Sequence, residues 1–142
     1  MRRKRNLKMA NEKTFQAQVL TPDGSRFKGD VVSVSVPGAS GSFQILYNHA
    51  PIISALDVGR VDIQKADNSK LTYAVSGGFV EMNDNQVTLL AERAIKPSDI
   101  DVEEAKKKLS DAKEKLKDPS IMQSDVDHQM KDAQNLIKLA NS

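Results

Sequence analysis

The sequence predicts a β-sandwich of two antiparallel sheets with about ten short strands, followed by a C-terminal antiparallel α-helical hairpin. In the N-terminal part of the chain, apolar and polar residues alternate in short runs separated by turn residues, which is typical of strands. From Pro97 onward, apolar residues recur at spacings of three and four, which indicates one face of a helix. We therefore expect a sandwich over residues 14–96 and a hairpin over residues 97–142, with residues 1–13 as a leader.

The predicted strands follow one another with only turns between them. The first places Phe15, Ala17 and Val19 on one face and ends at the turn 21–24. The later strands are expected around Val32–Val36, Ile52–Leu56, Val61–Ile63, Leu71–Val75, Phe79–Met82 and Gln86–Ala91. The turns between strands include residues 37–38, 67–68, 76–78 and 83–85. Because no helical pattern interrupts this series, an antiparallel sandwich or barrel is the expected arrangement.

The first helix of the hairpin is expected to begin near Ser98, with Asp101 completing a pattern like a capping box. Its apolar stripe consists of Ala105, Leu109, Ala112 and Leu116. The segment 117–120 contains Pro119 and ends this helix.

The second helix is expected to be capped by Ser120 or Ser124. Its apolar stripe consists of Val126, Met130, Ala133, Ile137 and Ala140. Two narrow stripes rich in alanine bury little surface, so the hairpin alone is expected to be marginally stable. It needs a second surface, either the sandwich or a partner protein.

The charge is unevenly distributed along the chain. The net charge is +2, but residues 1–13 contain six basic residues and only Glu12 as an acid, so they sum to +5 and the remaining chain to −3. We expect this leader to be disordered, with Met9 as an alternative start of the protein. A basic arm for nucleic acid or anionic lipid is the competing interpretation.

The residue types exclude several kinds of functional site. Cysteine is absent, and the two histidines, His49 and His128, have no companions at metal-ligand spacing, so neither a metal site nor a cysteine nucleophile is expected. The acidic pairs 99/101 and 125/127 lie at predicted helix starts, where the helix dipole favours carboxylates. No nucleotide-binding loop or catalytic motif is present, so we predict no catalytic residues and no cofactor. No apolar run approaches the roughly 20 residues that a membrane-spanning helix needs.

The segment 37–51 is denser in glycine and rigid turns than a sandwich requires. Gly38 and Gly41 allow a tight loop, and His49-Ala50-Pro51 forms a rigid turn before the next strand. Taken alone, this segment is a loop with structural glycines, and surface recognition is the alternative interpretation.

This segment and three later motifs resemble the epsilon-subunit family of bacterial and chloroplast F-type ATP synthases, whose mitochondrial counterpart is called delta. The later motifs are Leu56-Asp57-Val58-Gly59, Ser76-Gly77-Gly78-Phe79-Val80-Glu81 and Val87-Thr88-Leu89-Leu90-Ala91-Glu92. The resemblance covers residues 14–142, and the order of the motifs is its specific feature. Gln44 and Tyr47 depart from a glycine and a proline of the family pattern.

The resemblance implies a non-catalytic rotor subunit in the central stalk, which joins the gamma shaft to the c-ring during rotary ATP synthesis. It implies that Ser42 and His49 face the c-ring, although a hydrogen bond that stabilises the turn is an equal alternative for His49. The implied partners are gamma and the c-ring, without nucleic acid. The resemblance also implies that membrane contact occurs only through the complex, on the cytoplasmic face of the bacterial plasma membrane.

In relatives, the hairpin either folds on the sandwich or extends toward the catalytic hexamer of alpha and beta subunits and blocks ATP hydrolysis. Some relatives also bind ATP through an Ile/Leu-Asp-x-x-Arg-Ala motif. Here Glu104 occupies the arginine position and would repel a phosphate, so no ATP binding is expected. An unrelated sandwich-type binding module with a helical oligomerisation tail would account for the periodicity but not for the ordered motifs.

Overall fold

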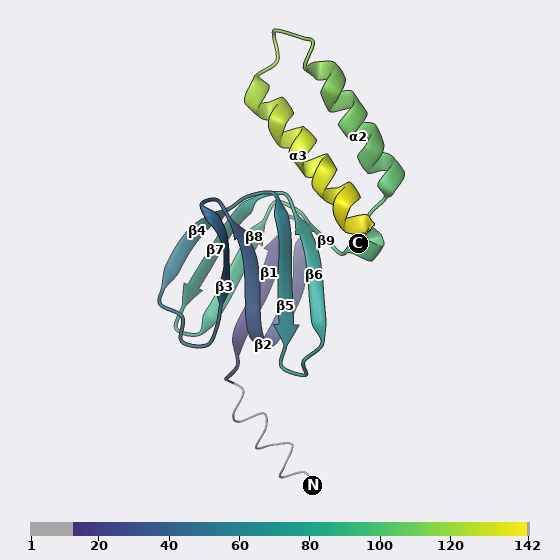
Figure 1. Cartoon of the computed structure of the whole chain (residues 1–142). Coiled ribbons are helices and arrows are strands. Elements are labelled where there is room, and N and C mark those ends of the chain that lie inside the picture. The colour runs from purple at the N-terminus through teal and green to yellow at the C-terminus, as the bar shows by residue number, and fades with distance from the viewer. Residues whose placement is uncertain (1–12, 142) are drawn as a thin grey trace.

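The computed structural model describes residues 13–141, and it forms a strand-rich body with a two-helix hairpin at one end (Figure 1). The described residues contain nine strands: β1 Phe15–Thr21, β2 Gly24–Gly38, β3 Gly41–Ile45, β4 Ile52–Leu56, β5 Gly59–Lys65, β6 Lys70–Val75, β7 Gly78–Asn83, β8 Gln86–Ala91 and β9 Ala94–Ile95. They are followed by a 3-10 turn η1 Pro97–Asp99 and the helices α2 Val102–Lys115 and α3 Gln123–Ala140. The predicted leader lies outside the described residues except for Lys13.

The predicted sandwich with a helical hairpin is confirmed, and the long strand β2 links its two layers. The first half of β2 pairs with β1, while its second half pairs with β3 and β5. The other layer contains β4, β7 and β8 and returns to β1. The β1–β8 pair is parallel, with Ala17 opposite Val87, whereas all other pairs in the described sheet are antiparallel. We expected antiparallel pairs throughout, and the exception arises because β1 and β8 are distant in sequence and no hairpin turn constrains their direction.

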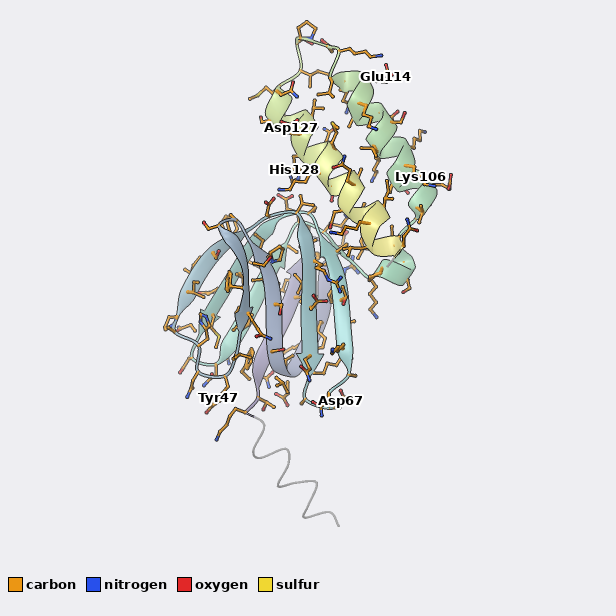
Figure 2. All side chains as sticks on the ribbon, in the orientation of Figure 1. Tyr47, Asp67, Lys106, Glu114, Asp127 and His128 are labelled. Carbon is orange, nitrogen blue, oxygen red and sulfur yellow. The ribbon has the colours of Figure 1, made fainter. Side chains whose placement is uncertain are left out.

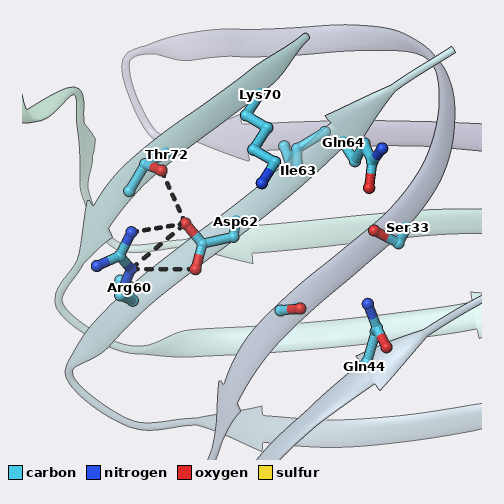
Figure 3. Close-up of a pocket in the computed structure, with 9 residues that line it drawn as sticks. Ser33, Gln44, Arg60, Asp62, Ile63, Gln64, Lys70 and Thr72 are labelled. Atoms are coloured by element: carbon cyan, nitrogen blue, oxygen red, sulfur yellow. Dashed lines mark hydrogen bonds and ion pairs between the residues drawn. The ribbon is translucent and has the colours of Figure 1, made fainter. Parts of the chain in front are cut away.

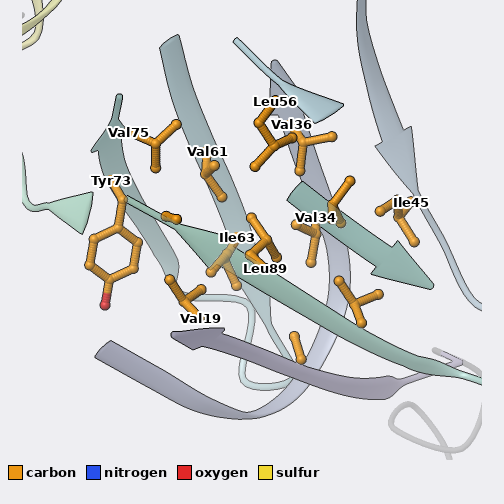
Figure 4. Close-up of a cluster of buried hydrophobic side chains, with 14 of the residues drawn as sticks. Val19, Val34, Val36, Ile45, Leu56, Val61, Ile63, Tyr73, Val75 and Leu89 are labelled. Carbon is orange, nitrogen blue, oxygen red and sulfur yellow. The ribbon is translucent and has the colours of Figure 1, made fainter. Parts of the chain in front are cut away.

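The sandwich core is made almost entirely of aliphatic side chains (Figure 4). Ile45, Ile63, Met82 and Leu89 are among the largest fully buried side chains. Tyr73 is the aromatic exception with a polar tip, and its hydroxyl donates a hydrogen bond to the Arg26 carbonyl at 2.9 Å. Burial raises the pKa of Tyr73, with Arg26 opposing the shift. The core therefore consists mainly of densely packed β-branched side chains, which fill the space that aromatic side chains occupy in many other proteins.

The helix starts differ from the predicted ones. Helix α2 begins at Val102, and Asp101 rather than Ser98 is its N-cap, because the Asp101 carboxylate accepts a hydrogen bond from the Glu104 amide at 3.1 Å. Helix α3 begins at Gln123 without a side-chain cap. The predicted cap Ser120 instead donates its hydroxyl hydrogen to Asp118 in the connecting turn. Ser120 therefore hydrogen-bonds within the turn and does not cap α3.

Candidate functional site

The outer surface of β4, β7 and β8 carries an exposed apolar patch, which we call the apolar face. It comprises Ile53, Ala55, Phe79 and Leu90, of which Ile53 is 73%, Phe79 56% and Leu90 53% exposed. Phe79 lies directly opposite Leu90 across one strand pair and Ala55 across the other, so the side chains lie side by side. Neighbouring apolar side chains this exposed are typical of a surface that binds another protein.

Strand alternation explains why these residues point outward. In β7, Val80 and Met82 point into the core. Because neighbouring side chains of a strand point to opposite faces, Phe79, which precedes Val80, points outward. Leu90 likewise alternates with the buried Leu89 and Ala91 on β8. We did not predict the apolar face. The sequence did contain a signal for it, because apolar residues occupy strand positions that alternate with the core positions and therefore point outward.

The other layer presents a polar outer surface with a hollow of about 350 Å³ (Figure 3). It is lined by Ser33, Ser35, Gln44, Arg60, Asp62, Ile63, Gln64, Lys70 and Thr72. Asp62 accepts hydrogen bonds from Arg60 Nε at 3.0 Å and Thr72 Oγ1 at 2.7 Å. Burial opposes ionisation of Asp62, but the hydrogen bonds from Arg60 and Thr72 outweigh it and lower its pKa. The two layers therefore differ sharply, one outer surface being apolar and the other a satisfied polar network.

The connection between β3 and β4 contains the predicted c-ring-facing residue His49. The turn places Tyr47 at the end of the sandwich opposite the hairpin (Figure 2). Asn48 and Asn85 hold this turn to the β7–β8 turn, since Asn85 Oδ1 accepts from the Asn48 amide at 2.7 Å and Asn85 Nδ2 donates to Asn48 Oδ1 at 2.9 Å. The half-buried His49 donates its amide hydrogen to Leu46 O at 3.1 Å. Sequence reasoning missed the Asn48–Asn85 contact, which joins residues far apart in the chain.

Ser42 is exposed in β3, where it pairs with Pro37 of β2. No hydrogen bond joins Ser42 to His49 within residues 13–141. The ring of the neighbouring Phe43 lies 6.5 Å from the His49 ring, centroid to centroid, so the turn folds back beside β3. The assignment of Ser42 and His49 to the c-ring remains a prediction.

Most residues of the two predicted apolar stripes are buried or half-buried in the hairpin. Ala105, Ala112, Val126 and Ala133 are buried, while Leu109, Met130 and Ile137 are half-buried and Leu116 is 42% exposed at the end of α2. Leu136 and Leu139 are also buried, and we did not predict them. They contact Ala74 of β6 and Ala105, so the C-terminal half of α3 has a second apolar face. The run of three apolar residues within 136–139 was the available signal.

A second hollow of about 210 Å³ lies where η1, α2 and α3 meet the sandwich. Its charged lining residues are Arg93, Asp99, Asp101, Glu104 and Lys108. Glu104 pairs with Lys108 at 3.3 Å. Acidic groups outnumber basic groups here, so the hollow is electrostatically unfavourable for a phosphate. The absence of ATP binding remains a prediction.

No three His, Asp or Glu side chains of residues 13–141 are placed to hold a metal ion together. Neither described helix is long and apolar enough to span a membrane.

Comparison with known proteins identifies the sandwich. The family described as "ATP synthase, Delta/Epsilon chain, beta-sandwich domain" matches residues 14–97. The ATP synthase epsilon chain of Halalkalibacterium halodurans is 47% identical over 103 residues, which make up 72% of this chain and 77% of that protein. The epsilon chain of Bacillus pumilus is 41% identical over 114 residues, covering 80% and 85% of the two chains.

Solved structures share the fold at low sequence identity. A chain of the Euglena gracilis mitochondrial ATP synthase assembly of OSCP, F1 and c-ring matches with a TM-score of 0.75 at 20% identity, covering 87% of this chain and 79% of that one. A chain of the Tetrahymena thermophila central stalk and c-ring matches with a TM-score of 0.60 at 14% identity, covering 92% and 96%. The family match, the identity to the bacterial relatives and the shared architecture together show that this chain belongs to the ATP synthase delta/epsilon chain family.

Proposed function

We propose that this chain is the epsilon subunit of an F-type ATP synthase, a non-catalytic part of the rotor that joins the gamma shaft to the c-ring. The observation that carries this proposal beyond family membership is the apolar face on the outside of one layer of the sandwich, whereas the other layer carries the polar network around Asp62. A rotor subunit transmits torque only if it is fixed to the shaft, and a firm contact requires an apolar surface that is available for burial. The two solved assemblies that share the fold contain a c-ring, which supports the same placement.

The apolar face is the surface that binds gamma. Burial of a large apolar side chain contributes about 1.5–3 kcal/mol, so Ile53, Phe79 and Leu90 together supply several kcal/mol against the cost of association. The polar surface around Asp62 lacks this capacity, because its charged groups already satisfy one another. Gamma therefore covers the layer of β4, β7 and β8 and leaves the polar layer toward solvent.

The end of the sandwich with Tyr47 and His49 faces the c-ring. It lies opposite the hairpin, and the Asn48–Asn85 contact keeps its turn in a defined shape. Ser42 is not part of this end, because it lies at the start of β3 opposite Pro37, whose carbonyl accepts from the amide of Asp57 next to the hairpin. The subunit is peripheral and lies on the cytoplasmic face of a bacterial plasma membrane, as its similarity to bacterial epsilon chains supports.

The hairpin regulates ATP hydrolysis by leaving the sandwich and reaching the catalytic hexamer. Its helices bury small residues such as Ala105 and Ala112, so exchange of one covering surface for another costs little. The stripe residues named above are the contacts that such an exchange would use.

Removal of residues 98–142 tests this regulatory role. In a reconstituted synthase, the truncated chain is expected to remain bound to gamma, because the apolar face is intact, and to raise ATP hydrolysis about fivefold or more, as is typical of a lost coupling between sites. Hydrolysis rates and the amount of bound chain are measured together, with the full chain as control. Unchanged hydrolysis at equal occupancy would show that the hairpin does not inhibit.

A further inference from the structure

Helix α3 makes only a small apolar contact with the sandwich. Leu136 and Leu139 are buried against Ala74, and Ile95 is only partly buried beside them. On the sandwich side, Ala74 is the one fully buried residue of this cluster within the described chain, and its side chain is a single methyl group. This contact holds α3 close to the sandwich but gives it little directional preference, because apolar contact is not directional.

Two ion pairs between α3 and the sandwich supply the missing direction. Lys131 Nζ lies 2.6 Å from Asp57 Oδ2 in the turn between β4 and β5. The next residue, Asp132, places Oδ2 2.5 Å from Arg93 Nη2 in the β8–β9 connection. The polarity of the two pairs is opposite, since the sandwich supplies the acid of one and the base of the other.

The opposite polarity selects one arrangement of the helix. If the two contacts were exchanged, Asp132 would meet Asp57 and Lys131 would meet Arg93, giving two like-charge pairs. Like charges in contact are unfavourable, so alternative orientations are penalised. One turn further along α3, Asn135 Nδ2 donates to the Gly59 carbonyl at 2.9 Å and reinforces the same orientation.

The two pairs differ in their shielding from solvent. The Asp57 and Lys131 side chains are about half-exposed, whereas Arg93 is 32% and Asp132 only 16% exposed. Arg93 Nε and Asp132 Oδ1 are buried without a hydrogen-bond partner. In a side-on bidentate arginine–carboxylate pair, these two atoms would form the second hydrogen bond, beside the one between Nη2 and Oδ2. Loss of either partner would leave the other charge poorly solvated, so the Arg93–Asp132 pair is the more sensitive one.

The Asp57 carboxylate also shows the effect of its partner. The hydrogen bond from Lys131, followed by the one from the Val58 amide, lowers the pKa of Asp57 below its ordinary value of 3.8. A lowered pKa means that the contact stabilises the docked helix above pH 3.8 and that this stabilisation is lost as the pH falls through the lowered value.

We propose that Asp57, Arg93, Lys131 and Asp132 form a charge-crossed latch that keeps the hairpin docked on the sandwich, and that breaking either pair releases it. This inference deepens the proposed regulatory role, which needs a hairpin that can be released. The latch itself is a property of the free chain and can be tested without the synthase, so it can fail while the proposed function stands, and the reverse is also true.

Thiol labelling measures release directly, because the natural sequence contains no cysteine. A cysteine in the variant Ala74→Cys lies under α3 at a position that is 1% exposed, and it reacts only when the hairpin opens. A cysteine in Val80→Cys, at a position with 0% exposure in the sandwich core, reacts only on global unfolding. The ratio of the two rates separates undocking from unfolding.

In the Ala74→Cys background, reversing the charge of Asp57 or Lys131 alone is expected to raise the labelling rate about fivefold, the upper range for an exposed pair. Reversing Arg93 or Asp132 alone is expected to raise it about tenfold or more, because this pair is less exposed. The exchanges Asp57→Lys with Lys131→Asp, and Arg93→Asp with Asp132→Arg, are expected to return the rate to within about twofold of the starting value. The milder variant Asp132→Asn guards against misfolding of the reversals.

The control is the exchange Glu114→Lys with Lys117→Glu, which reverses a more exposed ion pair at the end of the hairpin that lies away from the sandwich (Figure 2). It should leave labelling at position 74 unchanged. Single reversals without effect at position 74 would overturn the latch. So would paired exchanges that label as fast as the single variants, or an equal rise at position 80, which would mean that the pairs stabilise the whole fold.

Discussion

Replacing Phe79 by aspartate should abolish stable retention of the subunit in the synthase. The substitution removes the apolar side chain at the centre of the apolar face, flanked by Ala55 and Leu90 on the neighbouring strands. It also forces an unpaired carboxylate into the contact with gamma. The lost burial of about 2 kcal/mol and a desolvation cost of similar size predict at least about a hundredfold weaker binding.

The matched control for Phe79→Asp is Gln44→Asp, which introduces the same charge at an exposed strand position beside the polar hollow. Binding to isolated gamma can be measured by calorimetry, and folding can be checked from the unfolding transition. Phe79 is already more than half exposed, so the free subunit is expected to remain folded. Equal affinity of the two variants for gamma would show that the apolar face is not the binding surface.

Replacing Gly78 by alanine is expected to have the largest effect on stability. Gly78 opens β7 at a φ of +135°, and a Cβ atom there would lie 2.0 Å from the Leu90 carbonyl oxygen and 2.9 Å from Ala91 Cα. Both neighbours belong to the backbone of β8, so the strand pair must separate. Together with the strain of this φ, the loss should reach about 4 kcal/mol or more, a large share of the 5–15 kcal/mol typical of a domain.

Gly41→Ala provides the control for Gly78→Ala. Gly41 has a φ of +134°, but a Cβ atom there would meet nothing within 4 Å. Only the backbone strain applies, at about 1–2 kcal/mol. Urea unfolding midpoints of the two variants separate the causes. Equal losses would show that strain alone, rather than collision with β8, makes Gly78 necessary.

The local elements of the fold were predictable, because their causes lie within short segments. Alternation grouped Phe15, Ala17 and Val19 on one face, and all three are buried in the core. The spacing of Ala105, Ala112 and Ala133 identified the helix–helix contact. The capping error arose because Ser98 and Asp101 are both good caps, and only the path of the chain through η1 decides between them. Such competition between neighbouring residues depends on the three-dimensional context.

Contacts between distant segments were not predictable from the pattern. The parallel pairing of β1 with β8, the Asn48–Asn85 contact and the Arg93–Asp132 pair all join residues tens of positions apart. Single charged residues such as Arg93 give no indication of their partner in a sequence where 28% of residues are charged. The apolar face was predictable only in part. Strand alternation indicates that Phe79 points outward, but its proximity to Ile53 depends on the pairing of β4 with β7.

Binding of the gamma shaft by the apolar face underlies the proposed function. Site-specific photocrosslinking in the assembled synthase tests it most directly, with the photoreactive group placed at Phe79 on the apolar face and at Gln44 on the polar surface. If gamma covers the apolar face, position 79 gives a crosslinked product with gamma and position 44 gives none. A gamma product from position 44, or no gamma product from position 79 in a fully occupied complex, would show that gamma binds a different surface.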